Sequence, residues 1–93
     1  MTDGRDGCTG ALAIKHVPIR YPNSSGYTRT FRATNYLNTW RVFRRQTIQA
    51  VEVWGTCPWR IYSQRRFRGR IQSLLPGFSS HVNFIPGSIA QIP

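Results

Sequence analysis

The sequence contains very few acidic residues. Asp3, Asp6 and Glu52 carry the only three carboxylate side chains among the 93 residues. Paired carboxylates that could serve acid–base or glycosidase chemistry are therefore missing. A calcium site takes about six to eight oxygen ligands, several of them carboxylates, and this chain lacks the carboxylates to supply them. We expect no catalytic residues, no metal site and no cofactor, so the chain is not predicted to be an enzyme.

Cysteine, histidine and long apolar runs are scarce as well. Cys8 and Cys57 permit at most one intramolecular disulfide. Together with His16 and His81 they lack the spacing of a zinc motif, and we expect both histidines to lie on the surface. No apolar run approaches the length of a membrane span or of a signal-peptide core, so no transmembrane segment is predicted.

Arginine supplies nearly all of the charge that is present. Lysine and arginine together number 13, all but Lys15 are arginine, and the formal net charge is +10. Guanidinium groups form bidentate hydrogen bonds to phosphate and carboxylate, and they stack on aromatic faces. The sequence therefore favours an anionic partner, which could be a nucleic acid, an anionic lipid or an acidic glycan. The alternative is that the arginines only keep a small protein soluble.

Turn residues divide most of the chain into short segments. Proline and glycine recur at intervals of about 8 to 12 residues, which is typical of short strands joined by turns. Val51 and Val53 alternate with Glu52, as in a half-buried antiparallel strand. Trp59 and Ile61 share one face of a further strand in the same way. These patterns indicate a fold built from strands.

The resulting prediction is an all-β chain that folds as a small β-sandwich in a single domain, residues 11–93. Residues 1–10 contain three glycines and two aspartates and are expected to form a flexible leader. Residues 38–50 show no clear helical period and leave room for a turn or two of helix. We expect the domain to be monomeric.

Arginine residues are concentrated in two segments, around residues 41–45 and 60–70. In the second segment, alternation places Phe67, Gly69 and Ile71 on one side of a strand and its arginines on the other. The candidate anion-binding residues are Arg41, Arg44, Arg45, Arg60, Arg65, Arg66, Arg68 and Arg70. The interleaved aromatic residues are Trp40, Phe43, Trp54, Trp59 and Tyr62. Such a mixture can hold phosphates and stack bases, although for Trp59 and Phe67 a place in the core is favoured.

The second half of the chain carries a recognisable spacing of aromatic residues and glycine. Four residues separate Tyr62 from Phe67, and Gly69 follows after one more. This spacing resembles the aromatic-x4-aromatic-x-Gly signature of a βγ-crystallin Greek-key motif. Trp59 precedes it, and the later Pro-Gly-Phe and Gly-Ser-Ile stretches are similar to further segments of that family. The residues that carry the resemblance are Trp59, Tyr62, Phe67, Gly69, Gly77 and Ser88.

The resemblance implies a Greek-key β-sandwich in which the serine at Ser88 ties a folded hairpin to its sheet by hydrogen bonds. The first half matches less well, because Ile19 and Ser24 stand where the aromatic residues would fall. The family's calcium-binding stretch keeps only Asn83 and Ser88, and its counterpart in the first half falls near Arg44. The resemblance therefore implies a non-catalytic protein with little or no calcium binding.

Three functions are compatible with these observations. The first is a structural or binding protein of βγ-crystallin type with a strongly basic surface. The second is a secreted cationic effector of the killer-toxin or antimicrobial kind, for which we expect a disulfide between Cys8 and Cys57. The third is a nucleic-acid-binding β-barrel that uses an arginine–aromatic surface.

Overall fold

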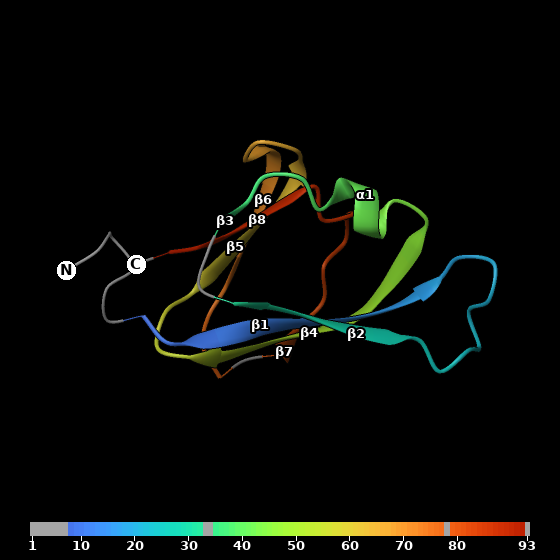
Figure 1. Ribbon diagram of the computed structural model, residues 1–93, viewed down its shortest axis with the longest axis horizontal. Coiled ribbons are helices and arrows are strands. Elements are labelled where there is room, and N and C mark those ends of the chain that lie inside the picture. The colour runs from blue at the N-terminus through green and yellow to red at the C-terminus, as the bar shows by residue number, and fades with distance from the viewer. Residues whose placement is uncertain (1–7, 33–34, 78, 93) are drawn as a thin grey trace.

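The computed structural model describes residues 8–32, 35–77 and 79–92, and these form two four-stranded antiparallel sheets that face each other (Figure 1). The all-β sandwich predicted from the sequence is confirmed. The elements are β1 (Gly10–Pro18), β2 (Tyr27–Arg32), β3 (Asn35–Tyr36), α1 (Trp40–Phe43), β4 (Gln46–Gly55), β5 (Trp59–Gln64), β6 (Arg68–Leu74), β7 (Ser79–Ser80) and β8 (Ser88–Gln91).

The two halves of the chain are arranged in the same way. One sheet has the strand order β2–β1–β4–β7, and the other has the order β6–β5–β8–β3. The first three strands of the two sheets correspond: β2, β1 and β4 occupy the same places in one sheet as β6, β5 and β8 in the other. Each sheet is completed by a short strand from the other half, β7 in one case and β3 in the other. Neither half therefore forms a complete sheet by itself.

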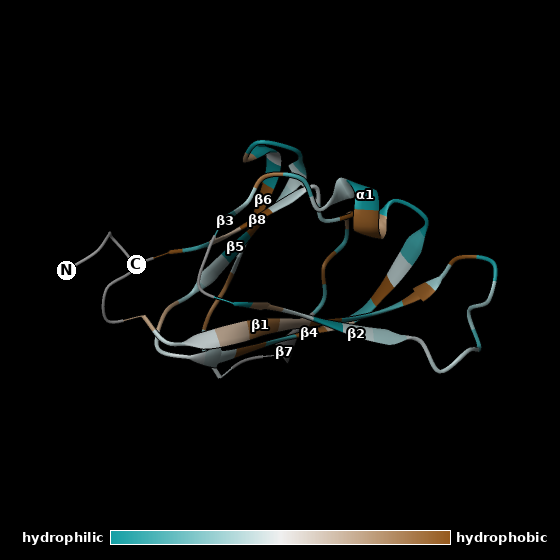
Figure 2. Ribbon diagram, in the orientation of Figure 1, coloured by the Kyte–Doolittle hydropathy of each residue, from teal (hydrophilic) through white to brown (hydrophobic). Residues whose placement is uncertain are grey.

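The core lies between the two sheets and is built from the alternation seen in the sequence. Val51 and Val53 are 1% and 0% exposed, while Glu52 between them faces solvent. Trp59 and Ile61 are fully buried on the facing sheet. The buried cluster consists of Leu12, Ile14, Phe31, Phe43, Val51, Val53, Trp59, Ile61, Leu74 and Ile89. Figure 2 shows that the single helical turn, α1, presents its hydrophobic side to this core and its hydrophilic side outward.

Strand β1 places His16 at period-two spacing after Leu12 and Ile14, which belong to the buried cluster. Its pairing with β4 shifts register after Lys15, where Gln49 of β4 has no partner on β1. His16 is only 6% exposed. Its Nδ1 lies 2.8 Å from Oε1 of Gln46, and its ring meets that of Phe43 edge-on at 5.1 Å. The prediction that His16 lies on the surface is wrong, because His16 lies on a strand with the same spacing as the buried Leu12 and Ile14; His81 is exposed, as predicted.

The predicted alternation through residues 66–71 is also wrong. Arg66 and Phe67 lie in a turn, both with positive φ (59° and 60°), so they belong to no strand face. Strand β6 begins only at Arg68, and Ile71, which was expected on the buried side, is 57% exposed. The reason is the register: Ile71 pairs with Tyr62, on the face opposite to the one where Trp59 pairs with the buried Leu74.

The start of the domain is fixed earlier than the sequence predicted. Cys8 forms a disulfide with Cys57, with the two Cα atoms 5.4 Å apart. The backbone N–H of Thr9 donates to Oγ1 of Thr56 at 3.0 Å, and β1 begins at Gly10. Residues 8–10 therefore belong to the sandwich. The remainder of the predicted leader lies outside the described residues.

We expect the disulfide to contribute about 4 kcal/mol to the free energy of unfolding. It joins residues that are 49 positions apart, so it removes much of the freedom of the unfolded chain. A Cys8→Ser, Cys57→Ser double variant should show this loss in urea denaturation. The mass of the wild-type chain should rise on reduction by the two added hydrogens. Two thiols that react before any reduction would contradict the pairing.

Gly69→Ala should destabilise the domain by about 2–3 kcal/mol in the same measurement, because alanine resists a positive φ and also meets a neighbour. The φ of Gly69 is +84°, and a Cβ there would collide with Oγ of Ser63. Gly77 is the matched control, since its φ is +81° but nothing lies within 4 Å of an added Cβ. Gly77→Ala should therefore show only the backbone strain, about 1 kcal/mol. Equal losses for the two variants would contradict the tight contact at Gly69.

Candidate functional site

The segment before α1 is anchored to the loop that leads into β8. The backbone N–H of Thr39 donates to the carbonyl of Gly87 at 2.9 Å, and its hydroxyl donates to the carbonyl of Pro86 at 2.8 Å. Thr39 is 2% exposed, so these bonds are shielded from water. Phe43, fully buried at the other end of α1, holds the helical turn against the core. Trp40 is consequently fixed at the surface, where 39% of it is exposed.

The turn between β5 and β6 is folded onto its own sheet and fastened by Ser88. The buried hydroxyl of Ser88 donates to the carbonyl of Gln64 at 2.6 Å and accepts from the backbone N–H of Phe67 at 2.9 Å. The rings of Tyr62 and Phe67 pack together with their centroids 5.4 Å apart. Gly87 passes so close to Gln64 that an added Cβ would lie 2.5 Å from its backbone. The hydrogen bonds of Ser88 are of the kind that the sequence resemblance implied for this serine.

A backbone hydrogen bond joins this turn to the segment before α1. The N–H of Arg66 donates to the carbonyl of Leu37 at 2.9 Å. The positive φ of Arg66 and Phe67 reverses the chain at this point, and the N–H of Gly87 donates to the carbonyl of Tyr62 at 2.7 Å. The arginines of the turn are thereby brought beside Trp40, although they follow it by more than twenty residues.

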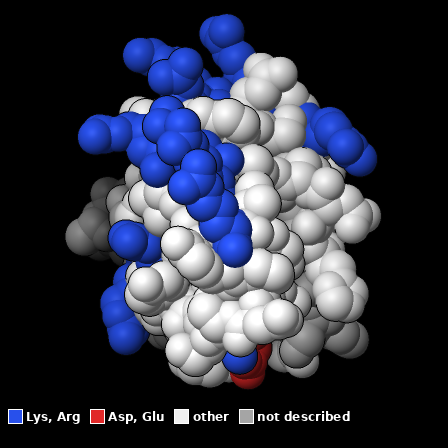
Figure 3. All heavy atoms as spheres, turned by 90° about the vertical axis from the view of Figure 1, so that its right-hand side faces the viewer, with Lys and Arg blue, Asp and Glu red and all other residues white. Residues whose placement is uncertain are grey.

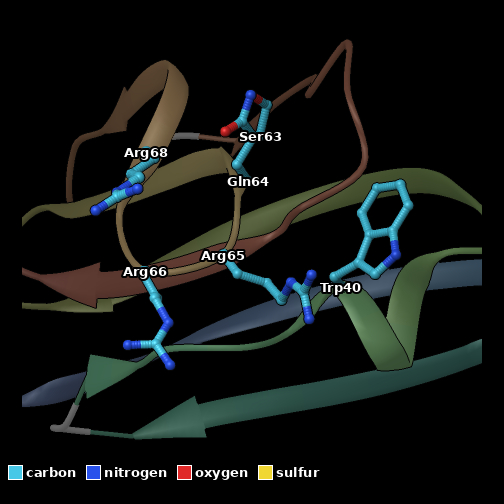
Figure 4. Close-up of a pocket in the computed structure, with 6 residues that line it drawn as sticks. All are labelled: Trp40, Ser63, Gln64, Arg65, Arg66 and Arg68. Carbon is cyan, nitrogen blue, oxygen red and sulfur yellow. The ribbon is translucent and has the colours of Figure 1, made fainter.

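Two open grooves run along this junction and share Trp40 and Arg65. The first encloses about 550 Å³ and is lined by Trp40, Ser63, Gln64, Arg65, Arg66 and Arg68. The second is lined by Trp40, Arg41, Arg44 and Arg65. In Figure 4 the guanidinium of Arg65 extends toward Trp40, and Arg66 and Arg68 lie on the far side of Arg65. We call the two grooves together the arginine surface.

The structure brings together five of the eight arginines that the sequence singled out. Arg41 and Arg44 come from one predicted cluster, and the β5–β6 turn with the first residue of β6 supplies Arg65, Arg66 and Arg68. The expected row of Arg66, Arg68 and Arg70 on one strand face is not present. Arg66 lies in the turn, and Arg70 packs over the ring of Phe84, 5.5 Å from its centroid. Neither groove is lined by Arg45, Arg60 or Arg70.

The aromatic residues fall into two groups. Trp59, Phe43 and Tyr62 are 0%, 0% and 8% exposed, so they belong to the packed structure and are closed to a ligand. Trp54 is 52% exposed, but it lies on β4 in the other sheet. Trp40 is therefore the aromatic residue that lines the arginine surface. Sequence spacing missed the convergence on Trp40, because the contacts that create it are backbone hydrogen bonds between distant segments.

No carboxylate of the described residues compensates the arginine surface. Glu52 is the one acidic residue in the described part of the chain, and its Oε1 accepts a hydrogen bond from Nε1 of Trp54 at 2.6 Å. Figure 3 shows basic side chains gathered over the upper part of this face, with the only visible acidic atoms at its lower edge. The guanidinium group of an arginine carries a positive charge. The surface therefore carries uncompensated positive charge.

The residues expected at the family's calcium site have other surroundings. The hydroxyl of Ser88 is buried in its two backbone contacts, while Asn83 and Arg44 are exposed. Within residues 8–32, 35–77 and 79–92, no three side chains of His, Cys, Asp or Glu converge as they would around a metal ion. The one helix in this part of the chain is far too short to cross a membrane.

No protein-family model, curated protein or solved structure matches this chain. The observations that bear on function are therefore the strand order, the geometry around Ser88 and the arginine surface. Of these, only the arginine surface presents chemistry to a ligand.

Ser88→Ala should lower the free energy of unfolding by about 1–3 kcal/mol, because it leaves the N–H of Phe67 and the carbonyl of Gln64 without their partner. Urea denaturation measures this change. Ser73→Ala is the control, since Ser73 is exposed on β6 and its loss should change stability by less than about 0.5 kcal/mol. Similar effects of the two substitutions would show that the Ser88 hydroxyl does not fasten the turn.

Proposed function

We propose that this chain is a non-catalytic domain of βγ-crystallin type that binds a polyanionic ligand on its arginine surface. One observation carries the proposal. Five arginines from two distant segments converge around an exposed tryptophan, with no carboxylate of the described residues among them. An arrangement that served solubility alone would not require the arginines to converge.

The strand order supports the family resemblance. In a Greek key, the fourth strand returns to lie beside the first. Here β4 lies beside β1, and β8 lies beside β5. The bonds of Ser88 are those that the resemblance implied, and the ring pair of Tyr62 and Phe67 and the positive φ of Gly69 fall on residues that carry the resemblance. Both levels of structure favour the same family.

The electrostatics favour a ligand with several negative charges. Guanidinium groups bind phosphate through paired, charge-assisted hydrogen bonds, and five of them can engage successive groups of a polyanion. Each phosphate that an arginine neutralises releases condensed counterions, so binding weakens steeply with salt. The net charge of +10 also steers anions toward the protein from a distance. A single small anion would leave most of the surface uncompensated.

The triple variant Arg65→Ala, Arg66→Ala, Arg68→Ala should weaken polyanion binding by about ten- to hundredfold. Salt titrations would be run with a single-stranded oligonucleotide, a heparin fragment and anionic vesicles in parallel. The slope of log affinity against log salt should also become shallower by up to about three units, because each lost phosphate contact removes about one.

The matched control is Arg20→Ala, Arg29→Ala, Arg32→Ala, which removes the same charge from β2 and the loop before it. These three residues line neither groove of the arginine surface. The control should therefore lose affinity only by the smaller amount that net charge predicts. If both triple variants lost affinity equally for every probe, the arginine surface would not be a site.

A secreted cationic effector is a second candidate, and the disulfide between Cys8 and Cys57 favours it. Disulfides form and persist in oxidising compartments. In that setting the positive charge would direct the domain to anionic cell surfaces. The vesicle arm of the salt titration separates the two candidates, because an effector of this kind should bind anionic vesicles more tightly than the oligonucleotide or heparin.

A further inference from the structure

Trp40 lies where the two grooves of the arginine surface meet. One groove continues from it to Arg66 and Arg68, and the other continues to Arg41 and Arg44. Trp40 therefore lines each groove together with arginines, and Arg65 is likewise shared between the grooves. A ligand that follows both grooves must pass this ring.

The geometry points to a single-stranded nucleic acid as the ligand, with one base stacked on Trp40 and phosphates of the neighbouring nucleotides in the two grooves. This inference rests on the proposed polyanion-binding function and adds the class of ligand. Proteins that bind single strands combine a positively charged groove for the backbone with aromatic rings on which bases stack. The arginine surface has arginines along each groove for the phosphates, and it has Trp40, which lines both grooves, for a base.

The indole favours a single strand over a duplex. In a duplex every base is stacked between its neighbours, and its faces are closed to a protein side chain. A single strand can turn a base outward, and any base can stack because every base has a π-face. The contact with Trp40 therefore predicts weak sequence preference.

The composition of the grooves disfavours a membrane. Trp40 is the only apolar side chain among the residues that line them, and the rest are arginines together with Ser63 and Gln64. A surface that inserts into a bilayer presents several large apolar side chains toward the lipid. A single ring in the wall of a charged groove suits a planar ligand group.

Trp40 is also held in place before any ligand arrives. Its own N–H lies 3.3 Å from the carbonyl of Gly87, and the preceding residue, Thr39, is buried and makes two further bonds to the same loop. A ring on a fixed backbone loses less conformational freedom on binding than one on a mobile loop. The stacking contact can therefore contribute measurably to affinity.

The test compares an oligonucleotide of about ten nucleotides with an abasic strand of the same length, which has the same phosphates and no bases. The full-length wild-type protein should bind the oligonucleotide about tenfold more tightly. Trp40→Ala should abolish this preference and leave binding of the abasic strand unchanged. In a Trp54→Phe background, fluorescence of the remaining exposed tryptophan should be quenched by the oligonucleotide and not by the abasic strand.

Two control variants test whether the effect is specific to the aromatic ring at position 40. Trp54→Ala removes the other exposed indole, which lies on the opposite sheet, and should keep the full preference for bases. Trp40→Tyr retains an aromatic face and should restore most of the preference that Trp40→Ala loses. Because both Trp40 variants change the same position, rescue by tyrosine would separate stacking from a loss of folding.

The outcomes distinguish this inference from the function on which it rests. Equal affinity for the oligonucleotide and the abasic strand, with loss of both in the Arg65, Arg66 and Arg68 triple variant, would overturn base stacking and leave polyanion binding intact. Tighter binding to a duplex of the same sequence or to anionic vesicles would overturn the single strand as the ligand. Affinities that are unchanged in the arginine variant would overturn the proposed function itself.

Discussion

The arrangement of the arginine surface depends on two hydrogen bonds of the buried Ser88 hydroxyl. It bonds to both sides of the β5–β6 turn at 2.6 Å and 2.9 Å, and so fixes a loop that would otherwise extend into water. The turn then meets the segment before α1 through the bond from Arg66 to the carbonyl of Leu37. Because a hydroxyl both donates and accepts, one side chain satisfies two backbone groups that the positive φ at Arg66 and Phe67 removes from the strand ladder.

The arginine surface, like each of the two sheets, is built from both halves of the chain. Trp40, Arg41 and Arg44 come from the first half of the chain, and the arginines from residues 65–68 come from the second half. The loop at Gly87 contacts both segments, through Thr39 on one side and Tyr62 on the other. Since each sheet also takes its last strand from the other half, the arginine surface forms only when the whole domain has folded.

The sequence predicted the fold class because apolar residues recur at every second position in a strand that has one buried face. Val51, Val53 and Trp59 lie on such buried faces. The prediction failed at His16, where the strand that buries it was not recognised, and at Ile71, which the register places on the face away from the core. It identified the arginines of the arginine surface but not their grouping. That grouping depends on hydrogen bonds between backbone atoms, such as that from the N–H of Arg66 to the carbonyl of Leu37. Every residue type except proline can form such bonds, so the side chains in the sequence do not reveal them.

The arginines on the outer strands have a second consequence. Strands β2 and β6 each end a sheet, and their outer rows of backbone donors and acceptors face no further strand among the described residues. Such rows pair readily with the same strand of another molecule, and repulsion between like charges opposes this. β2 carries Arg29 and Arg32, and β6 carries Arg68 and Arg70. If the domain binds a polyanion as we propose, the ligand would neutralise part of that charge and so weaken the protection against self-association.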